Sequence, residues 1–313
     1  MTLKLIKITL IASLLTLSAC STMKTAGPSR ADLIVFPTAT PVKVSYQDEV
    51  KLLKLNQLIV SQKKLTPTQK AVLLYQRGLV YDRIGLIGHA QLNFREAIDN
   101  DPTYAPAYNS IGVYWLSAKN YDQAFEAFDS ALELDKKETF SYLHRAVGLV
   151  QIERYSLASQ DIEKFYESKP NDPYRIIWRY LINAHLDEKT AQENLKLHSK
   201  PENDHRFIWA VIDLFAGDIG EGDVLQLSNV GVRSNREHAE RLAEMYFYLG
   251  YWHREKGNLD KAIRYYQLTT ATGIHDFIEY KYAYMELASI QNELMQAHEK
   301  KLAQQREEEK KEQ

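Results

Sequence analysis

The sequence predicts an all-α protein in which paired helices stack into a solenoid with an inner surface. One pattern returns at a spacing of 34 residues: small, aromatic, small, large apolar, small. Two antiparallel helices pack closely only where a small side chain on one faces a bulky side chain on the other. A unit of this kind cannot bury its apolar face alone, so neighbouring units must stack. The three consecutive sets are Gly78, Tyr81, Ala90, Phe94 and Ala97; Gly112, Trp115, Ala124, Phe128 and Ala131; and Ala146, Leu149, Ala158, Ile162 and Phe165.

The period and the order of residue types resemble the tetratricopeptide repeat, a helix–turn–helix unit. We place repeats near residues 71–104, 105–138, 139–172 and 243–276, with degenerate helices over 173–242, so that the solenoid covers 46–292. The last repeat is indicated by Gly250, which follows Ala146 at three periods plus two residues. This near-integral gap favours degenerate repeats between them over a separate domain.

Helix boundaries are indicated at several points along the solenoid. Thr66-Pro67 is typical of a helix start, with a capping side chain followed by proline at the first helical position. Gly85 is expected to end that helix, and Asp187-Glu188 is expected to form a turn between two helices. His253 replaces an aromatic residue of the repeat pattern, so we expect it to pack against a neighbouring turn.

The first 19 residues are typical of a secretory signal peptide. Lys4 and Lys7 precede an apolar run over residues 8–17, which is shorter than the roughly 20 residues that a membrane-spanning helix needs. The run ends in Leu-Ser-Ala-Cys, which resembles the lipobox of bacterial lipoproteins and makes Cys20 the expected lipidation site. The alternative is an ordinary signal peptide cut near Ala19, which would leave Cys20 as a free thiol.

Cys20 is the only cysteine of the chain, so an internal disulfide has no second partner. Two or three acyl chains on it would anchor the protein to a membrane almost permanently. By resemblance to enterobacterial lipoproteins, Ser21 permits sorting to the outer membrane. The expected location is therefore the outer membrane, lipid-anchored and facing the periplasm.

Two segments outside the solenoid have their own composition. Residues 20–45 form the expected lipidated N-terminus and tether, and they are rich in Thr, Gly, Pro and Ser. Within them, residues 33–36 form an apolar patch that is expected to dock on the solenoid or on a partner. Residues 293–313 form a charged tail of mainly Lys, Glu and Gln, either a solvated helix extension or a disordered segment.

Charge and motifs exclude several classes of function. Without residues 1–19 the chain carries 37 basic and 41 acidic side chains. This slight acidic excess does not favour binding to nucleic acid. The sequence has no His-Glu-x-x-His, no phosphate-binding glycine loop and no Gly-x-Ser-x-Gly. His198 and His205 are seven residues apart, which matches no common metal pair. We therefore expect no enzyme activity, no cofactor and no metal.

The inner surface supplies the candidate partner-binding residues. In similar repeats, positions 2, 5, 9, 12 and 13 of the first helix face the groove. Their mixed polar and aromatic character suits a peptide or protein surface, although a merely solvated face is the alternative. With Gly78 as position 8, the candidates are Tyr75, Asp82, Arg83, Asn109, Ser117, Gln151, Tyr251, Arg254 and Glu255.

Several local runs make the whole chain resemble the NlpI lipoproteins of γ-proteobacterial outer membranes. The runs outside the repeat consensus, such as Leu-Asp-Glu-Lys over 186–189, make the resemblance specific. The runs that also match the family are LLYQRGLVYD over 73–82, YDQAFEAFDS over 121–130, NDP over 171–173, FYLG over 247–250 and HDF over 275–277. The longer charged tail and residues 21–45 depart from the family.

The resemblance implies a homodimeric adaptor. Such proteins bind a periplasmic C-terminal-processing protease, present peptidoglycan hydrolases, notably a murein endopeptidase, for degradation, and gather cell-wall enzymes. Two alternatives remain: a repeat lipoprotein for pilus, secretin or outer-membrane protein assembly, and a lipoprotein hydrolase, against which the missing catalytic motifs weigh.

Overall fold

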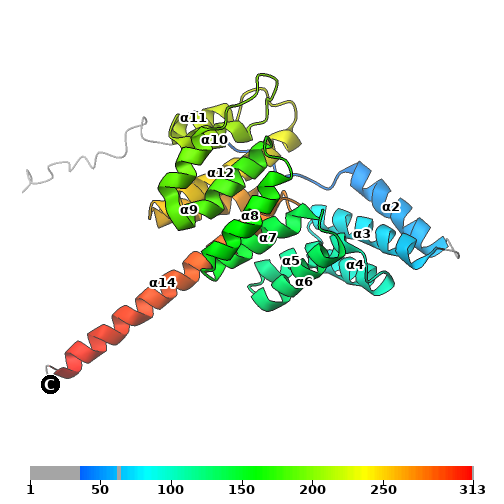
Figure 1. Ribbon diagram of the computed structural model, residues 1–313, viewed down its shortest axis with the longest axis horizontal. Coiled ribbons are helices and arrows are strands. Elements are labelled where there is room, and N and C mark those ends of the chain that lie inside the picture. The colour runs from blue at the N-terminus through cyan, green and yellow to red at the C-terminus, as the bar shows by residue number, and fades with distance from the viewer. Residues whose placement is uncertain (1–35, 62–64, 312–313) are drawn as a thin grey trace, which may run out of the picture. The chain divides into compact units, whose positions relative to one another are not determined.

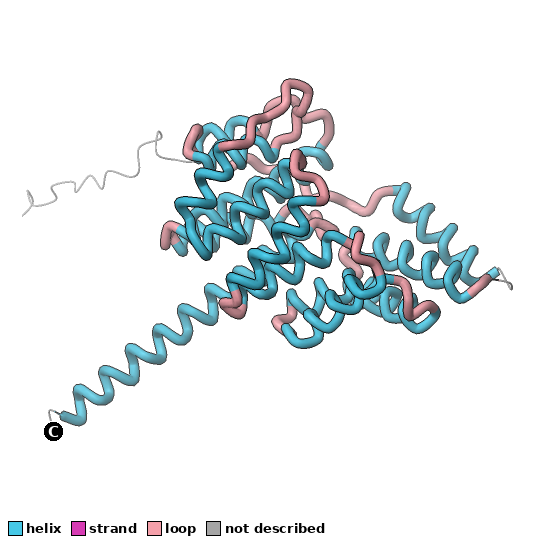
Figure 2. The backbone as a smooth tube through the Cα atoms, in the orientation of Figure 1, coloured by secondary structure: helices cyan, strands magenta, loops and turns pink. Residues whose placement is uncertain are grey.

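Paired helices make up almost all of the part of the chain that the structure describes. The structure, a computed structural model, describes residues 36–61 and 65–311. Thirteen helices and no strand occur in these two stretches (Figures 1 and 2). All thirteen belong to one compact unit, Pro37–Gln313, and the other unit is Met1–Phe36. The signal peptide, Cys20 and most of the expected tether lie outside the described residues.

The helices follow one another with short connections in most of the chain. They are α2 (Tyr46–Ser61), α3 (Pro67–Arg83), α4 (Ile87–Asn100), α5 (Ala105–Ser117), α6 (Tyr121–Leu134), α7 (Thr139–Gln151), α8 (Tyr155–Glu167), α9 (Pro173–Lys196), α10 (Ile208–Ala216), α11 (Glu221–Leu227), α12 (Asn235–Glu255), α13 (Leu259–Ala271) and α14 (Ile278–Lys311).

The repeat pattern marks the points where paired helices cross. A Cβ atom added to Gly78 would lie 2.6 Å from Cε1 of Phe94, and one added to Gly112 would lie 2.6 Å from Cε1 of Phe128. In the last repeat, a Cβ atom on Gly250 would lie 2.7 Å from the ring of Tyr266. Since the partners are 16 residues apart each time, the predicted phase of the repeats is confirmed, and so is the all-α solenoid.

The turn inside each repeat requires a left-handed backbone at one equivalent position. Gly85 has φ = 80° and Gly257 has φ = 73°, as expected where a helix must stop and reverse. The same position is filled by Lys119 and Glu153, each with φ = 59°. A residue with a Cβ atom costs about 1 kcal/mol or more in this conformation, so packing of the flanking helices holds these two turns.

The predicted start of α3 is confirmed in detail. The backbone N–H of Gln69 donates to Oγ1 of Thr66 (3.2 Å), and the N–H of Thr66 donates to Oε1 of Gln69 (3.0 Å). This reciprocal pair satisfies two N–H groups that the helix itself leaves free.

The central region keeps the helices but loses the regular pairing. α9 is interrupted at Asp187, whose φ of −155° and ψ of 96° are not helical, which confirms the predicted turn. The side chain of Asp187 then accepts from the backbone N–H of Thr190 (3.1 Å) and so starts the second part of the helix. Before the turn, Trp178 packs its ring 5.9 Å from the rings of Phe247 and Tyr282. α9 therefore packs in the same apolar core as α12 and α14.

Part of the expected tether is packed on α12. The hydroxyl of Tyr246 donates to the carbonyl of Pro37. Backbone N–H and C=O groups of Thr40 bond the side chain of Asn235 at 2.9 and 2.8 Å. Val42 also packs on the apolar cluster that includes Ala239. Residues 37–42 are therefore held against the solenoid.

The C-terminal tail is a helix extension. α14 continues without interruption to Lys311, and Figure 1 shows its red end extending away from the other helices. Ile290 is the last buried residue of α14, and each residue from Gln291 to Glu309 is exposed.

Candidate protein-binding surface

The first half of α14 lies across the first helices of the repeats. Nζ of Lys281 is 2.9 Å from Oδ2 of Asp82 in α3. The other carboxylate oxygen of Asp82 accepts from the hydroxyl of Tyr114 in α5. Asp82 is 8% exposed, so its charge is compensated inside the protein by a cation from α14 and a hydroxyl from α5.

Through Tyr282 and Glu286, α14 also meets α7 and α12. Nδ1 of His144 lies 2.7 Å from the hydroxyl oxygen of Tyr282, and burial, with Lys281 nearby, lowers the pKa of His144 to about 3. Glu286 accepts from Nε2 of Gln151 (3.1 Å) and from the guanidinium of Arg254. We call the side of α3, α5, α7 and α12 that α14 covers the inner face.

Four of the nine predicted partner-binding residues contact the chain's own C-terminal segment. Asp82, Gln151 and Arg254 bond α14, as described above. Nε of Arg83 lies 2.9 Å from Asp276, just before α14, and its Nη1 lies 3.3 Å from Asp48. The repeat phase predicts that these residues face the groove, and there they contact α14 or, in the case of Arg83, the residue Asp276 just before it. Binding of a partner at these positions remains a prediction.

Three further candidates are half-buried between neighbouring repeats. The ring of Tyr75 packs 5.5 Å from the ring of Phe94 and 5.3 Å from that of Tyr104. Oδ1 of Asn109 accepts from the hydroxyl of Ser141 (3.1 Å). The hydroxyl of Ser117 donates to the carbonyl four residues earlier, at 2.8 Å. These side chains serve contacts within and between repeats.

The last two candidates, Tyr251 and Glu255, line a cavity of about 290 Å³ beside α9 and α10. The hydroxyl of Tyr251 donates to the carbonyl of Leu181 (3.2 Å) and lies 2.8 Å from Nε2 of His185. Glu255 is exposed overall, and partial desolvation of its carboxyl group raises its pKa. The structure therefore separates the predicted set into residues beside α14, residues between repeats and this cavity.

The α14 side of the inner face was missed by sequence reasoning. Tyr282, Met285 and Ile290 recur at helical spacing, a signal that a buried face was present. The spacing could not identify the surface that this face meets, because α3, α5 and α7 lie more than a hundred residues away in the chain.

Neither a metal centre nor a membrane span is indicated by the described residues. Among them, no group of three or more His, Cys, Asp or Glu side chains is placed to hold a metal ion. No helix within residues 36–61 and 65–311 combines the length and apolar character that crossing a membrane requires.

Known proteins resemble the chain in its repeats. Residues 75–138 match the family model of the tetratricopeptide repeat. YrrB, described as a tetratricopeptide-repeat protein with an unusual peptide-binding site, is 14% identical over 75% of this chain and 97% of its own, with a TM-score of 0.40. MamA from Desulfovibrio magneticus RS-1 is 15% identical over 49% of this chain and 94% of its own, with a TM-score of 0.37. The C-terminal part of a repeat protein from Cytophaga hutchinsonii is 15% identical over 72% of this chain and 90% of its own, with a TM-score of 0.35.

The family match covers α4, α5, α6 and the greater part of α3. These are the helices in which the glycine–aromatic crossings recur with the repeat period. Together these two observations identify residues 75–138 as a tetratricopeptide-repeat segment within an all-α solenoid.

Proposed function

We propose that the protein is a scaffold that binds other proteins, and more specifically an adaptor anchored by lipid to the outer membrane and facing the periplasm. Its partners would be a C-terminal-processing protease and peptidoglycan hydrolases, a murein endopeptidase above all. The observation that carries the general role is the tetratricopeptide-repeat segment at residues 75–138, because stacked repeats present extended surfaces to other proteins. The specific partners are supported by the sequence resemblance alone.

The adaptor mechanism needs no catalytic group on the scaffold. Holding a protease and its client on one particle turns a bimolecular encounter into a nearly intramolecular one, with local concentrations of up to about millimolar for a short connection. Because one scaffold must hold both proteins, excess scaffold separates them onto different particles. Client loss should therefore accelerate and then slow as scaffold is added.

The test is the half-life of the client in a purified mixture of scaffold, protease and client, measured over a range of scaffold concentrations. The scaffold alone should show no hydrolysis of the client or of peptidoglycan. If no ratio accelerates client loss, the adaptor mechanism is rejected. Co-purification of a secretin or an outer-membrane barrel from detergent-solubilised membranes would favour the assembly alternative.

Attachment to the membrane is tested through Cys20, which the proposal makes the acyl acceptor. Metabolic labelling with palmitate should mark the natural chain and leave Cys20→Ala unlabelled, and the variant should be released as precursor or soluble protein. Label retained in the variant would reject lipidation at this residue.

The proposed homodimer is supported by an apolar stripe on α2. Tyr46, Leu53 and Val60 recur every seven residues on one side of the helix and are 79%, 70% and 82% exposed. Burying such a stripe against a second copy would remove apolar surface from water. Leu53→Glu with Val60→Glu should give a monomer in light scattering, whereas Leu197→Glu, at a residue 81% exposed elsewhere, should not. A dimer that survives the double change would place the interface on another surface.

A further inference from the structure

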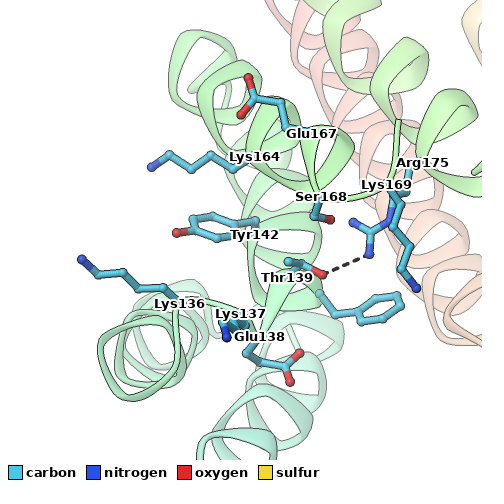
Figure 3. Close-up of a pocket in the computed structure, with 11 residues that line it drawn as sticks. Lys136, Lys137, Glu138, Thr139, Tyr142, Lys164, Glu167, Ser168, Lys169 and Arg175 are labelled. Carbon is cyan, nitrogen blue, oxygen red and sulfur yellow. Dashed lines mark hydrogen bonds between the residues drawn. The ribbon is translucent and has the colours of Figure 1, made fainter. Parts of the chain in front are cut away.

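A basic cavity of about 730 Å³ lies where the second and third repeats meet the central region (Figure 3). The turn between α6 and α7, the start of α7, the end of α8 and the start of α9 form its wall. This volume is within the range of about 300–1,000 Å³ that is common for ligand sites. The cations that line it are Lys136, Lys137, Lys164, Lys169 and Arg175.

The deepest cation of this cavity is Arg175, which is only 6% exposed. Its Nη2 donates to Oγ1 of Thr139 (3.1 Å), its Nη1 donates to the carbonyl of Phe165, and its guanidinium lies 3.9 Å from the centre of the Phe165 ring. Arg175 forms no ion pair within the described part of the chain, and the nearby Asp172 is paired with Arg206 at 2.8 Å. A buried cation usually has an anionic partner, and this one has only neutral acceptors.

The four lysines add to the positive charge of the cavity. None of them forms an ion pair within residues 36–61 and 65–311. The two acids of the lining, Glu138 and Glu167, do not balance five cations. Burial, with Asp135 adding to it, raises the pKa of Glu138. The residues that line the cavity therefore carry an excess of positive charge.

An aromatic surface lies beside these cations. The ring of Phe140 is 49% exposed, and its centre is 5.6 Å from that of Phe165. Nζ of Lys164 lies 5.1 Å from the centre of the Tyr142 ring, which holds one ammonium group at the edge of the cavity. Since Phe140 is the one large apolar side chain exposed in this lining, the cavity offers a single apolar contact next to several cations.

We propose that this cavity binds a carboxylate-bearing peptide segment of a partner protein, with the carboxylate at Arg175 and the lysines and an apolar side chain against Phe140. The inference rests on the proposed scaffold role for the kind of partner. A lipid headgroup would satisfy the cations but would also need an apolar surface for its chains, which one phenylalanine does not supply. The sequence gives one sign of the site, because Lys136 stands where the first and third repeats have Pro102 and Pro170.

The experiment measures fluorescence anisotropy of a labelled acidic peptide of alternating Glu and Leu, with a free C-terminal carboxylate. The natural chain should bind it, and binding should weaken with added salt. Two charge reversals, Lys136→Glu with Lys137→Glu and Lys164→Glu with Lys169→Glu, should each weaken binding by about tenfold or more, equivalent to about 1.4 kcal/mol. The matched control, Lys300→Glu with Lys301→Glu on the exposed part of α14, has the same charge change and should stay within about twofold.

Further measurements show which carboxylate of the peptide binds and whether Phe140 contributes to binding. A peptide amidated at its C-terminus that no longer binds identifies the terminal carboxylate, and one that still binds identifies the glutamates; either supports the proposal. Phe140→Ala should weaken binding without changing its salt dependence, and circular dichroism checks that both kinds of variant keep their helices.

The proposal is overturned if the acidic peptide does not bind or if the control weakens binding as much as the cavity variants. It is also overturned if the lysine variants lose binding to phosphatidylglycerol vesicles and not to the peptide. Client loss in the protease mixture is measured separately with the natural chain. Acceleration there without peptide binding would reject the cavity and leave the adaptor function standing.

Discussion

The two halves of α14 belong to one uninterrupted helix but have opposite surroundings. In residues 278–290, Tyr282, Ala283 and Ile290 are almost completely buried. In residues 291–309 every residue is exposed, including Leu294 at 48% and Met295 at 50%. The second half is helical although none of its residues is buried, so the local sequence is enough to form this helix. Where the helix lies depends on the surface that buries its first half. The first half supports the fold, whereas the second half is exposed, with Glu293 near its start bonding the guanidinium of Arg254.

The first half also occupies the surface on which repeats of this type are expected to bind partners. Lys281, Tyr282 and Glu286 satisfy Asp82, His144 and Arg254 in the way that a bound segment would. A partner must therefore displace this half of α14 or use the surfaces that it leaves open, among them the α2 stripe and the basic cavity.

The largest expected effect is from Tyr282→Ala in the buried half. Tyr282 is 1% exposed, packs on Trp178 and bonds His144, so truncation leaves a cavity and an unpaired polar group. The free energy of unfolding should fall by about 3–5 kcal/mol, as for other buried aromatic residues. Urea unfolding followed by circular dichroism measures it. Leu302→Ala in the exposed half should stay within about 0.5 kcal/mol, and equal losses in the two variants would remove the distinction between the halves.

A smaller loss is expected from Lys281→Met. The change removes the ammonium group that faces Asp82 while keeping most of the apolar stem. Leaving a buried carboxylate without its partner costs about 1–3 kcal/mol or more. Lys301→Met in the exposed half is the control and should change little. Adding Asp82→Asn to Lys281→Met should recover part of the stability, and no recovery would show that charge is not the reason for the loss.

The pH dependence of stability should be governed in part by Glu244 of α12. Burial, with Glu279 of α14 nearby, raises the pKa of Glu244 to about 8, whereas an unfolded glutamate titrates near 4.5. Between these values the folded state binds more protons than the unfolded state, so stability falls as pH rises through this range. The loss from this one group is at most about 1.4 kcal/mol per pH unit.

Glu244→Gln keeps an acceptor for the hydroxyl of Tyr174, which lies 2.7 Å from Glu244 in the natural chain. The melting temperature of the variant should fall less than that of the natural chain between about pH 7 and pH 8. Glu308→Gln, in the exposed half of α14, should keep the natural pH dependence. Parallel curves for the natural chain and Glu244→Gln would contradict the assignment.

The smallest effect is expected when the chain is ended after Gln291. The removed part of α14 has no buried residue between Asn292 and Glu309, so the melting temperature should stay within about 2 °C, equivalent to less than about 1 kcal/mol. Differential scanning calorimetry measures it. A large drop would mean that the exposed half stabilises the fold.

Much of the fold could be predicted from sequence because the repeats specify it locally. Gly112 and Phe128 lie on the two helices of one pair, and their contact depends only on the phase of the repeat. Thr66 and Asp187 begin helices through bonds to residues three positions away. Lys119 and Glu153 gave no such signal, because their left-handed turns are imposed by the helices on both sides.

The candidate site could be predicted only in part. The repeat phase located Asp82 and Gln151 on the inner face, but their partners Lys281 and Glu286 lie far along the chain. The basic cavity joins lysines from the α6–α7 turn, from α8 and from the α8–α9 connection around Arg175, and no local motif connects them. Its one local sign, lysine in place of proline at position 136, has no meaning until the neighbouring helix ends are placed.

By itself, the sequence determined the helices, their pairing and the spacing of the crossings, because these depend on contacts between residues close in the chain. The tertiary structure alone decided that α14 covers the inner face and that residues 37–42 lie on α12. The physical reason is that the sequence shows which apolar side chains must be buried and which charges must be paired. It does not show which surface buries or pairs them. Which surface does so depends on how all the repeats stack.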